Sequence, residues 1–214
     1  MKKEDKSVDP RLFWERKIVS WENGRYGLYK TSQVLETVAD RSSNSLRFRL
    51  DFAEEILKTV VTGKHVIELG CGSALLAERL ISAGAVGYTG YDIAAPAIER
   101  ANERLKKSTV REKISLVRSN LSTIDKLEGD IVFSLGLLDW LDPEDIERVF
   151  LMTEDKLFLH AISEKRFSIS QILHRIYVFF AYGYKTNGYV PKYYNGSEVV
   201  DIAKKYGAQD VDII

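Results

Sequence analysis

The sequence predicts an α/β fold in which a doubly wound, mostly parallel sheet is covered by helices on both faces. Short apolar runs alternate with helical patterns from residue 62 to residue 162, as repeated βαβ units require. The run at 131–135 is predominantly apolar, which is typical of a parallel strand buried on both faces. The run at 66–69 turns through two glycines into a helix, and the next run is followed by the single acid Asp92. This order predicts a ligand site at the carboxyl ends of the strands.

Residues 1–61 are predicted to form a helical cap that precedes the sheet. Asp9-Pro10 suits the N-cap and first position of a helix, which Asn23-Gly24 should end. A second helix is expected at 33–39. A third is expected at 45–60, where apolar residues recur at helical spacing.

Residues 62–214 are predicted to form one domain around the sheet. Six strands are expected, at 66–69, 87–91, 114–117, 131–135, 157–162 and 208–214. Helices should begin near Ala74, Pro96, Asp142-Pro143 and Ser197. An aromatic insertion at 165–194, with a helical run at 167–184, separates the fifth strand from the last helix.

The composition narrows the range of functions. Lysine plus arginine and aspartate plus glutamate number 31 each, so the net charge is zero and no nucleic-acid partner is expected. The chain has one cysteine, and no metal-ligand spacing is visible. No uncharged run approaches the length of a membrane span, and the N-terminus lacks an apolar signal region. We therefore expect a cytoplasmic protein without a membrane span.

The glycine turn after the first strand is the strongest functional signal. Gly70 and Gly72 allow the backbone to approach a ligand, and the free N–H groups of the following helix favour an anionic group. Asp92 can accept hydrogen bonds from a ribose diol. Dinucleotides and S-adenosylmethionine both fit these features. Leu75 stands where a dinucleotide fingerprint has its third glycine, and no Tyr-x-x-x-Lys pair follows the fourth strand, which disfavours a nicotinamide-dependent oxidoreductase.

Glu68, Gly70 and Gly72 resemble motif I of the class I S-adenosylmethionine-dependent methyltransferases, E/D-x-G-x-G-x-G, with Ala74 in place of the last glycine. The resemblance implies the Rossmann-like fold of that class. It also implies a final antiparallel strand, for which no residues remain after Ile214. The implied cofactor is S-adenosyl-L-methionine. The residues that the resemblance assigns to it are Glu68, Gly70, Cys71, Gly72, Asp92, Ile93, Asn120, Leu121, Ser134 and Leu135.

Two of these positions have competing interpretations. Asn120 stands where the class usually has an acid that accepts from the adenine amino group, and an amide oxygen can also accept. A simple turn residue explains Asn120 equally well. Cys71 could be read as a nucleophile, but we prefer a small residue in a tight loop.

The acceptor is expected to be a small molecule, methylated on oxygen or nitrogen, such as a sugar or a secondary metabolite. Ser134-Leu135-Gly136-Leu137 lacks the proline pair found in methyltransferases that act on nucleic-acid bases. A hydroxyl acceptor usually needs a general base, and the candidates are Asp139, His160 and His174. A solvated loop acid and a satisfied core histidine are the competing interpretations of Asp139 and His160.

Two further alternatives remain open at this stage. Ala74 and Asn120 keep open a cofactor-binding regulatory or scaffold protein without catalytic activity. The aromatic segment 167–194, with its interspersed arginines and lysines, could form the acceptor pocket together with the N-terminal helices. It could instead pack on the core, form a homodimer interface, or contact a membrane surface.

Overall fold

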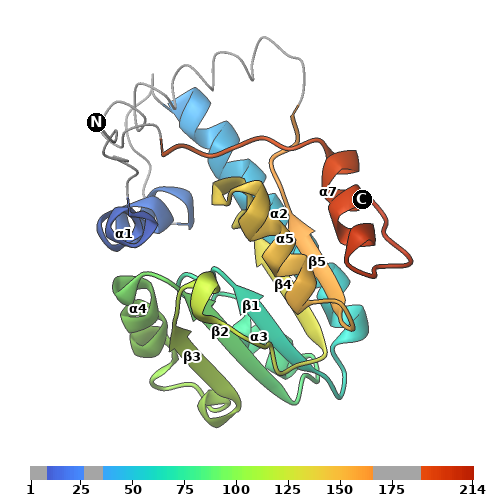
Figure 1. Ribbon diagram of the computed structural model, residues 1–214. Coiled ribbons are helices and arrows are strands. Elements are labelled where there is room, and N and C mark those ends of the chain that lie inside the picture. Colours follow the sequence, from blue (N-terminus) through green and yellow to red (C-terminus); the bar gives the residue numbers. More distant parts are fainter. Residues whose placement is uncertain (1–8, 27–35, 166–188) are drawn as a thin grey trace.

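The computed structural model describes residues 9–26, 36–165 and 189–214, and it contains a five-stranded parallel sheet (Figure 1). The strands are β1 (His65–Leu69), β2 (Gly87–Asp92), β3 (Ile114–Arg118), β4 (Ile131–Leu135) and β5 (Leu157–Ala161). Their order is β3-β2-β1-β4-β5, and every pairing is parallel. The predicted α/β fold with a parallel sheet is therefore confirmed.

The strand order places a switch point between β1 and β4. From β1 the chain moves outward through β2 to β3, then returns to the other side of β1 with β4 and continues to β5. Connections on the two sides of this point cover opposite faces of the sheet, which leaves a crevice at the carboxyl ends of β1 and β4. The register sets Leu69 of β1 beside Tyr91 of β2, so the loops that follow these strands start at the same level.

Helices cover both faces of the sheet. α2 (Glu36–Val60), α3 (Ala77–Ser82) and α4 (Ala95–Leu105) supply one hydrophobic cluster, and α5 (Pro143–Met152) and α7 (Gly196–Lys205) supply the other. Successive residues of β1 serve opposite clusters: Val66 belongs to the first and Ile67 to the second. This alternation follows from the two-residue period of a strand.

Helix α1 (Pro10–Tyr26) lies over the carboxyl edge of the sheet (Figure 1). It packs against α2 and α4. Ile18 of α1 is buried against Ala94 and Ala97 at the start of α4. An ion pair of 2.6 Å between Glu15 and Arg118 also ties α1 to the end of β3.

Several predicted boundaries differ from the structure. The helices expected at 33–39 and 45–60 belong to one continuous helix, α2, within the described residues, and α1 continues past Asn23-Gly24. Helix α3 begins at Ala77 rather than Ala74, because Ala74 has a left-handed φ of 53° that a right-handed helix cannot include. Helix α7 is capped by Asn195 and Glu198 rather than Ser197.

The sixth strand predicted at 208–214 is wrong: these residues are described and form no strand. Val211 instead packs on the cluster of α5 and α7, while Ile213 and Ile214 are largely exposed. Three short 3-10 helices complete the described fold: η1 (Arg111–Lys113), η2 (Leu121–Thr123) and η3 (Leu138–Trp140).

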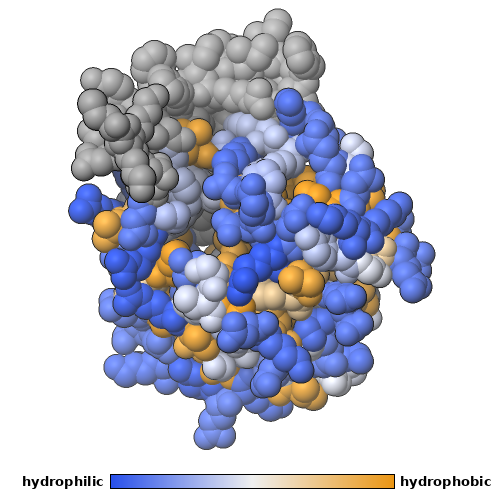
Figure 2. Space-filling view, in the orientation of Figure 1, coloured by the Kyte–Doolittle hydropathy of each residue, from blue (hydrophilic) through white to orange (hydrophobic). Residues whose placement is uncertain are grey.

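Hydrophilic residues cover most of the face shown in Figure 2, with apolar residues scattered among them. Within the described ranges, no helix is both long enough and apolar enough to span a membrane.

Candidate active site

A cavity of about 320 Å³ lies at the carboxyl ends of the strands, where the sequence predicts a ligand site, and beneath α1. It contains all the residues assigned to the cofactor from the sequence except one: Glu68, Gly70, Cys71, Gly72, Asp92, Ile93, Asn120, Leu121 and Leu135 line it. The exception is Ser134, which is fully buried in β4 away from the cavity.

The loop after β1 is held in a conformation that favours glycine. Gly70, Gly72 and Ala74 have φ values of 70°, 53° and 53°. The N–H groups of Gly70 and Cys71 both donate to the carbonyl of Tyr91, at 2.8 and 3.0 Å. The loop therefore folds back over the end of β2. Ala74 adopts the left-handed conformation despite its Cβ, at a cost of roughly 1–2 kcal/mol.

Asp92 fixes this loop from the end of β2. Its Oδ2 accepts from the Gly72 N–H at 2.8 Å, and its Oδ1 accepts from the Ala94 N–H at 2.9 Å. Burial raises the pKa of the carboxyl, while these two hydrogen bonds lower it. A carboxylate has about four acceptor positions, so each oxygen can still accept one further hydrogen bond.

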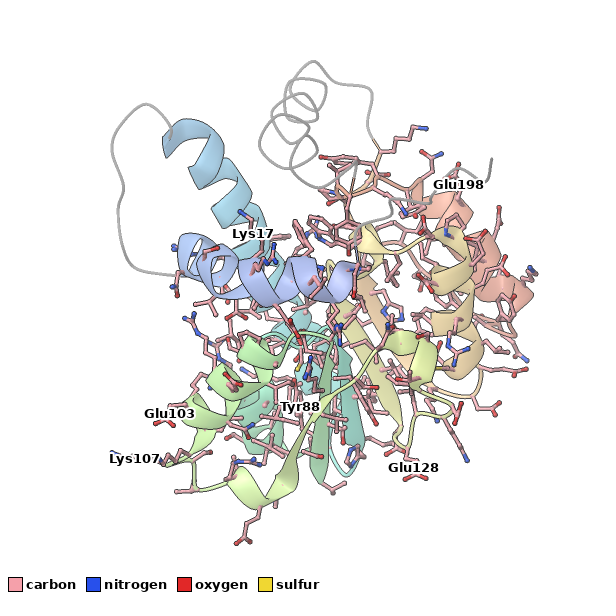
Figure 3. All side chains as sticks on the ribbon, turned by 60° about the vertical axis from the view of Figure 1, so that its left-hand side comes forward. Lys17, Tyr88, Glu103, Lys107, Glu128 and Glu198 are labelled. Atoms are coloured by element: carbon pink, nitrogen blue, oxygen red, sulfur yellow. The ribbon has the colours of Figure 1, made fainter. Side chains whose placement is uncertain are left out.

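Glu68, in β1 just before the loop, is paired with Tyr88 of β2. The Tyr88 hydroxyl donates to Glu68 Oε2, and both side chains are buried. Tyr88 lies in the interior beneath α1 (Figure 3). Burial raises the pKa of Glu68 to about 8, with the nearby charges of Asp92 and Glu22 acting in the same direction. Glu68 therefore holds its proton at neutral pH.

Cys71 is a small packing residue, as we preferred from the sequence. Its thiol packs against Gly90, where an added Cβ would lie 2.8 Å from the sulfur. Burial raises the pKa of this thiol well above its usual value, so the nucleophilic thiolate is suppressed.

Two groups that sequence reasoning missed complete the glycine loop. Arg104 of α4 donates to the carbonyls of Ser73 and Ala74 and pairs with Glu78. Glu22 of α1 accepts from the Ser73 N–H at 2.8 Å. Glu22 lies 51 residues before Ser73, so no local motif could have revealed this contact.

One stripe of α1 forms a wall of the cavity. Pro10, Trp14, Ile18 and Glu22 all line it, and each is four residues from the next. This spacing places the four side chains on one face of a helix. Asp9 and Arg11, at the start of α1, lie near Asn120, whereas Glu22 reaches the glycine loop.

Aromatic rings gather around Trp14 of this stripe. We call this group the aromatic cluster: Phe13, Trp14, Trp140 and Tyr189. The Trp14 indole N–H donates to the Tyr189 hydroxyl at 3.2 Å, and the rings of Trp14 and Trp140 are 4.8 Å apart. Burial raises the pKa of Tyr189 to about 12. Only residues 189–194 of the predicted aromatic segment lie within the described part of the chain.

Asp139 is held in a buried network rather than facing the cavity. Its Oδ1 accepts from the Ser163 N–H at 2.6 Å, its Oδ2 accepts from the Ser163 hydroxyl at 2.7 Å, and Arg49 of α2 lies 3.4 Å away. Burial raises the pKa of Asp139, against the opposing influence of Ser163 and Arg49. The network joins η3, α2 and the segment after β5.

His160 also lies outside the cavity. Its Nδ1 is 2.9 Å from the Ser134 hydroxyl, and its ring packs on Phe150 and Phe158. Burial lowers the pKa of His160 to about 4. His174, the third candidate base, lies outside the described residues.

Asn120 makes the contact expected of a turn residue. Its side-chain oxygen accepts from the Ser122 N–H at 3.1 Å and caps η2. Asn120 also lines the cavity. An amide oxygen has two acceptor positions, so the side-chain oxygen can accept a second hydrogen bond.

Three comparisons place this fold and loop among known proteins. Residues 66–154 match the family model described as a methyltransferase domain. The ubiquinone biosynthesis O-methyltransferase of Coxiella burnetii (strain Dugway 5J108-111) is 26% identical over 170 residues, covering 77% of this chain and 71% of that protein. The ribosomal protein L11 methyltransferase of Shewanella baltica (strain OS185) is 31% identical over 109 residues, covering 50% and 36%.

Among solved structures, the fold is similar to magnesium protoporphyrin IX methyltransferase from Synechocystis PCC 6803 with bound SAH. The TM-score is 0.70 at 16% sequence identity, and the match covers 92% of this chain and 87% of that one. This likeness concerns the fold.

The sheet order, glycine loop and terminal acid of β2 define a Rossmann-like protein with a site for a nucleotide-containing cofactor. Residues 66–154, which contain this loop and this acid, match the methyltransferase domain family, and the fold is that of the class I S-adenosylmethionine-dependent methyltransferases. The resemblance of its motif I to that class is thereby confirmed.

Proposed function

We propose that this chain transfers the methyl group of S-adenosylmethionine to an oxygen or nitrogen atom of a small-molecule acceptor. The observation that carries this proposal is the position of α1. One face of this helix forms a wall of the cavity, and its Trp14 ring packs directly on the ring of Trp140, which also lines the cavity. An acceptor must enter beside this helix, which suits a small molecule better than a folded macromolecule.

The cavity residues fit the parts of the cofactor. Asp92 has spare acceptor capacity for the ribose hydroxyls, and Ile93 offers an apolar surface for the adenine. The glycine loop leaves room for the amino-acid end. Asn120 can accept from the adenine amino group with the second position of its amide oxygen.

Bound S-adenosylmethionine supplies an electrophilic methyl group. The protein must align the acceptor with it and exclude water. Leu135, Gly136 and Leu137, at the end of β4, form an apolar wall beside the glycine loop. The aromatic cluster excludes water from the other side. We propose that these residues orient the acceptor.

We propose that neither Asp139 nor His160 takes the acceptor's proton. Both oxygens of Asp139 accept hydrogen bonds, and the His160 ring packs on Phe150 and Phe158 outside the cavity, where burial lowers its pKa to about 4. His174 stays a candidate from the sequence. An acceptor with a nucleophile that is already basic, such as a carboxylate or a neutral amine, needs no protein base.

The names of two relatives support a small acceptor: a ubiquinone biosynthesis O-methyltransferase and a magnesium protoporphyrin IX methyltransferase. The relative named for a ribosomal protein matches this chain over 36% of its own length, so it weighs less. A sugar or secondary metabolite remains our proposal for the acceptor.

Calorimetry and turnover together test the proposed function. S-adenosylhomocysteine should bind with micromolar affinity, about −8 kcal/mol, whereas NAD should not bind. The substitution Asp92→Ala should weaken binding by about 1.5–3 kcal/mol. Transfer of a labelled methyl group to a panel of small acceptors should follow. Binding without transfer to any acceptor, from small molecules to protein extract, would identify a cofactor-binding scaffold instead.

A further inference from the structure

Glu22 is the only charged residue of α1 that lines the cavity within the described residues. Its Oε1 accepts from the Ser73 N–H, and a Cβ on Gly72 would lie 2.4 Å from that same oxygen. Glu22 is only 5% exposed. The glycine at position 72 therefore makes room for a carboxylate that arrives from a distant helix.

One oxygen of the Glu22 carboxylate accepts no hydrogen bond. Its Oε2 is buried and has no hydrogen-bond partner, and the nearest cation is Arg100 Nε at 3.6 Å. A buried carboxylate oxygen without a donor is costly, so such an arrangement is favourable only when something else supplies the donor.

The other two acids of the loop are already engaged. Glu68 accepts from Tyr88, and its raised pKa leaves it neutral at pH 7. Asp92 accepts from two backbone N–H groups and lies nearer the side where a ribose would bind. Among these three acids, Glu22 is therefore the one with a buried oxygen that accepts no hydrogen bond.

We propose that Glu22 accepts a hydrogen bond from the ammonium group at the amino-acid end of S-adenosylmethionine. An ammonium carries three donors and no acceptor, so it requires such a partner. This inference rests on the proposed function, because it places the amino-acid end of the cofactor at the glycine loop. This hydrogen bond would make α1 part of the cofactor site, because the helix would contact the bound cofactor directly. Figure 3 shows α1 crossing directly above the interior that contains Tyr88.

The test compares two ligands in the full-length protein. Calorimetry would measure the Glu22→Gln variant with S-adenosylhomocysteine and with the analogue that lacks the α-amino group. Glutamine keeps the size and the contact with Ser73 but loses the charge. The variant should bind S-adenosylhomocysteine about tenfold to a hundredfold more weakly, as expected for one charge-assisted hydrogen bond. Its affinity for the deamino analogue should change by less than about threefold.

The Glu15→Gln variant is the matched control. Glu15 is also on α1, but it pairs with Arg118 outside the cavity. If loosening of α1 were the cause of weaker binding, Glu15→Gln and Glu22→Gln would each weaken both ligands equally. Equal losses for the two ligands in Glu22→Gln overturn the proposal. Tighter binding of S-adenosylhomocysteine overturns it as well, because it would mean that Glu22 occupies an anion position and competes with the cofactor. A wild-type protein that fails to bind S-adenosylhomocysteine contradicts the proposed function itself.

Discussion

The two sides of the cavity are built in different ways. The glycine-loop side comes mostly from one short stretch, from Glu68 to Asp92, and its contacts are hydrogen bonds between loop N–H groups, carbonyls and acids. The aromatic cluster combines α1 with η3 and Tyr189, both of which lie more than one hundred residues after α1 along the chain. The first side is fixed by local geometry, whereas the second depends on the packing of distant segments.

This difference separates two kinds of substitution. Changes at the glycine loop should act locally, through the protonation of Glu68 or the backbone conformation of Ala74. Changes around η3 should alter the stability with which distant segments are held together. Four predictions test this separation.

The largest effect is expected at Asp139, which joins η3 to α2 and to Ser163. The substitution Asp139→Ala leaves the Ser163 N–H without its acceptor and removes the carboxylate that pairs with Arg49. We expect the free energy of unfolding to fall by about 4 kcal/mol, as when one partner of a buried ion pair is removed. Denaturant unfolding measures this, with the exposed Glu103→Ala as control. A variant that keeps its stability but loses turnover would show that Asp139 is catalytic.

The second prediction concerns Glu68 and pH. The folded protein holds the Glu68 proton up to pH about 8, whereas the unfolded chain loses it near the ordinary value of 4.5. The stability contributed by the protonated form is therefore fully present below pH 4.5 and is lost as pH rises through 8. Glutamine cannot ionise, so Glu68→Gln should gain about 3 kcal/mol relative to wild type between pH 5.5 and 8.5.

Thermal unfolding at several pH values measures this gain. Parallel stability curves for wild type and Glu68→Gln would mean that Glu68 is ionised in the folded protein.

The third prediction concerns the aromatic cluster. The Trp140 ring contacts Phe13, Trp14 and Tyr189. Trp140→Ala should cost about 2 kcal/mol and speed hydrogen exchange of the α1 amides, because these ring contacts hold α1 over the cavity. Trp140→Phe should retain most of the protection. Unchanged exchange in Trp140→Ala would show that the contacts of α1 with α2, α4 and Arg118 hold it without the help of this ring.

The smallest effect is expected at Ala74. Glycine would relieve the strained φ of 53° but would lose a buried methyl group and add freedom to the unfolded chain. These terms oppose each other, so Ala74→Gly should stay within about 1 kcal/mol of wild type and keep its cofactor affinity. Calorimetric unfolding and a binding titration check both. A larger gain would mean that the alanine is a liability of this loop.

The strands and the glycine loop were predictable because their signals are local. Two-residue alternation and apolar runs located all five strands that the structure contains, and the spacing from Gly70 to Asp92 located the cavity. The helix break expected between 39 and 45 was wrong, because weak helix propensity is readily overridden by tertiary packing.

The interpretation of single side chains was less predictable. Asp139 follows β4 much as Asp92 ends β2, and the sequence does not distinguish them. Their difference comes from Arg49 and Ser163, which reach Asp139 from 90 residues before and 24 residues after it. The contacts of Glu22 and Arg104 could not be predicted for the same reason, because only the folded chain brings these residues to Ser73.

The arrangement of Trp14 and Trp140 gives the protein an optical reporter. Two of its three tryptophans line the cavity with their rings 4.8 Å apart. Indoles this close couple their electronic transitions, and their emission responds to a purine stacked nearby or to a ring displaced by a neighbour. Near-ultraviolet circular dichroism and tryptophan emission should therefore follow occupancy of the cavity without any attached dye. A rapid-mixing experiment on unlabelled protein could then measure the rate of ligand binding separately from the rate at which α1 changes position.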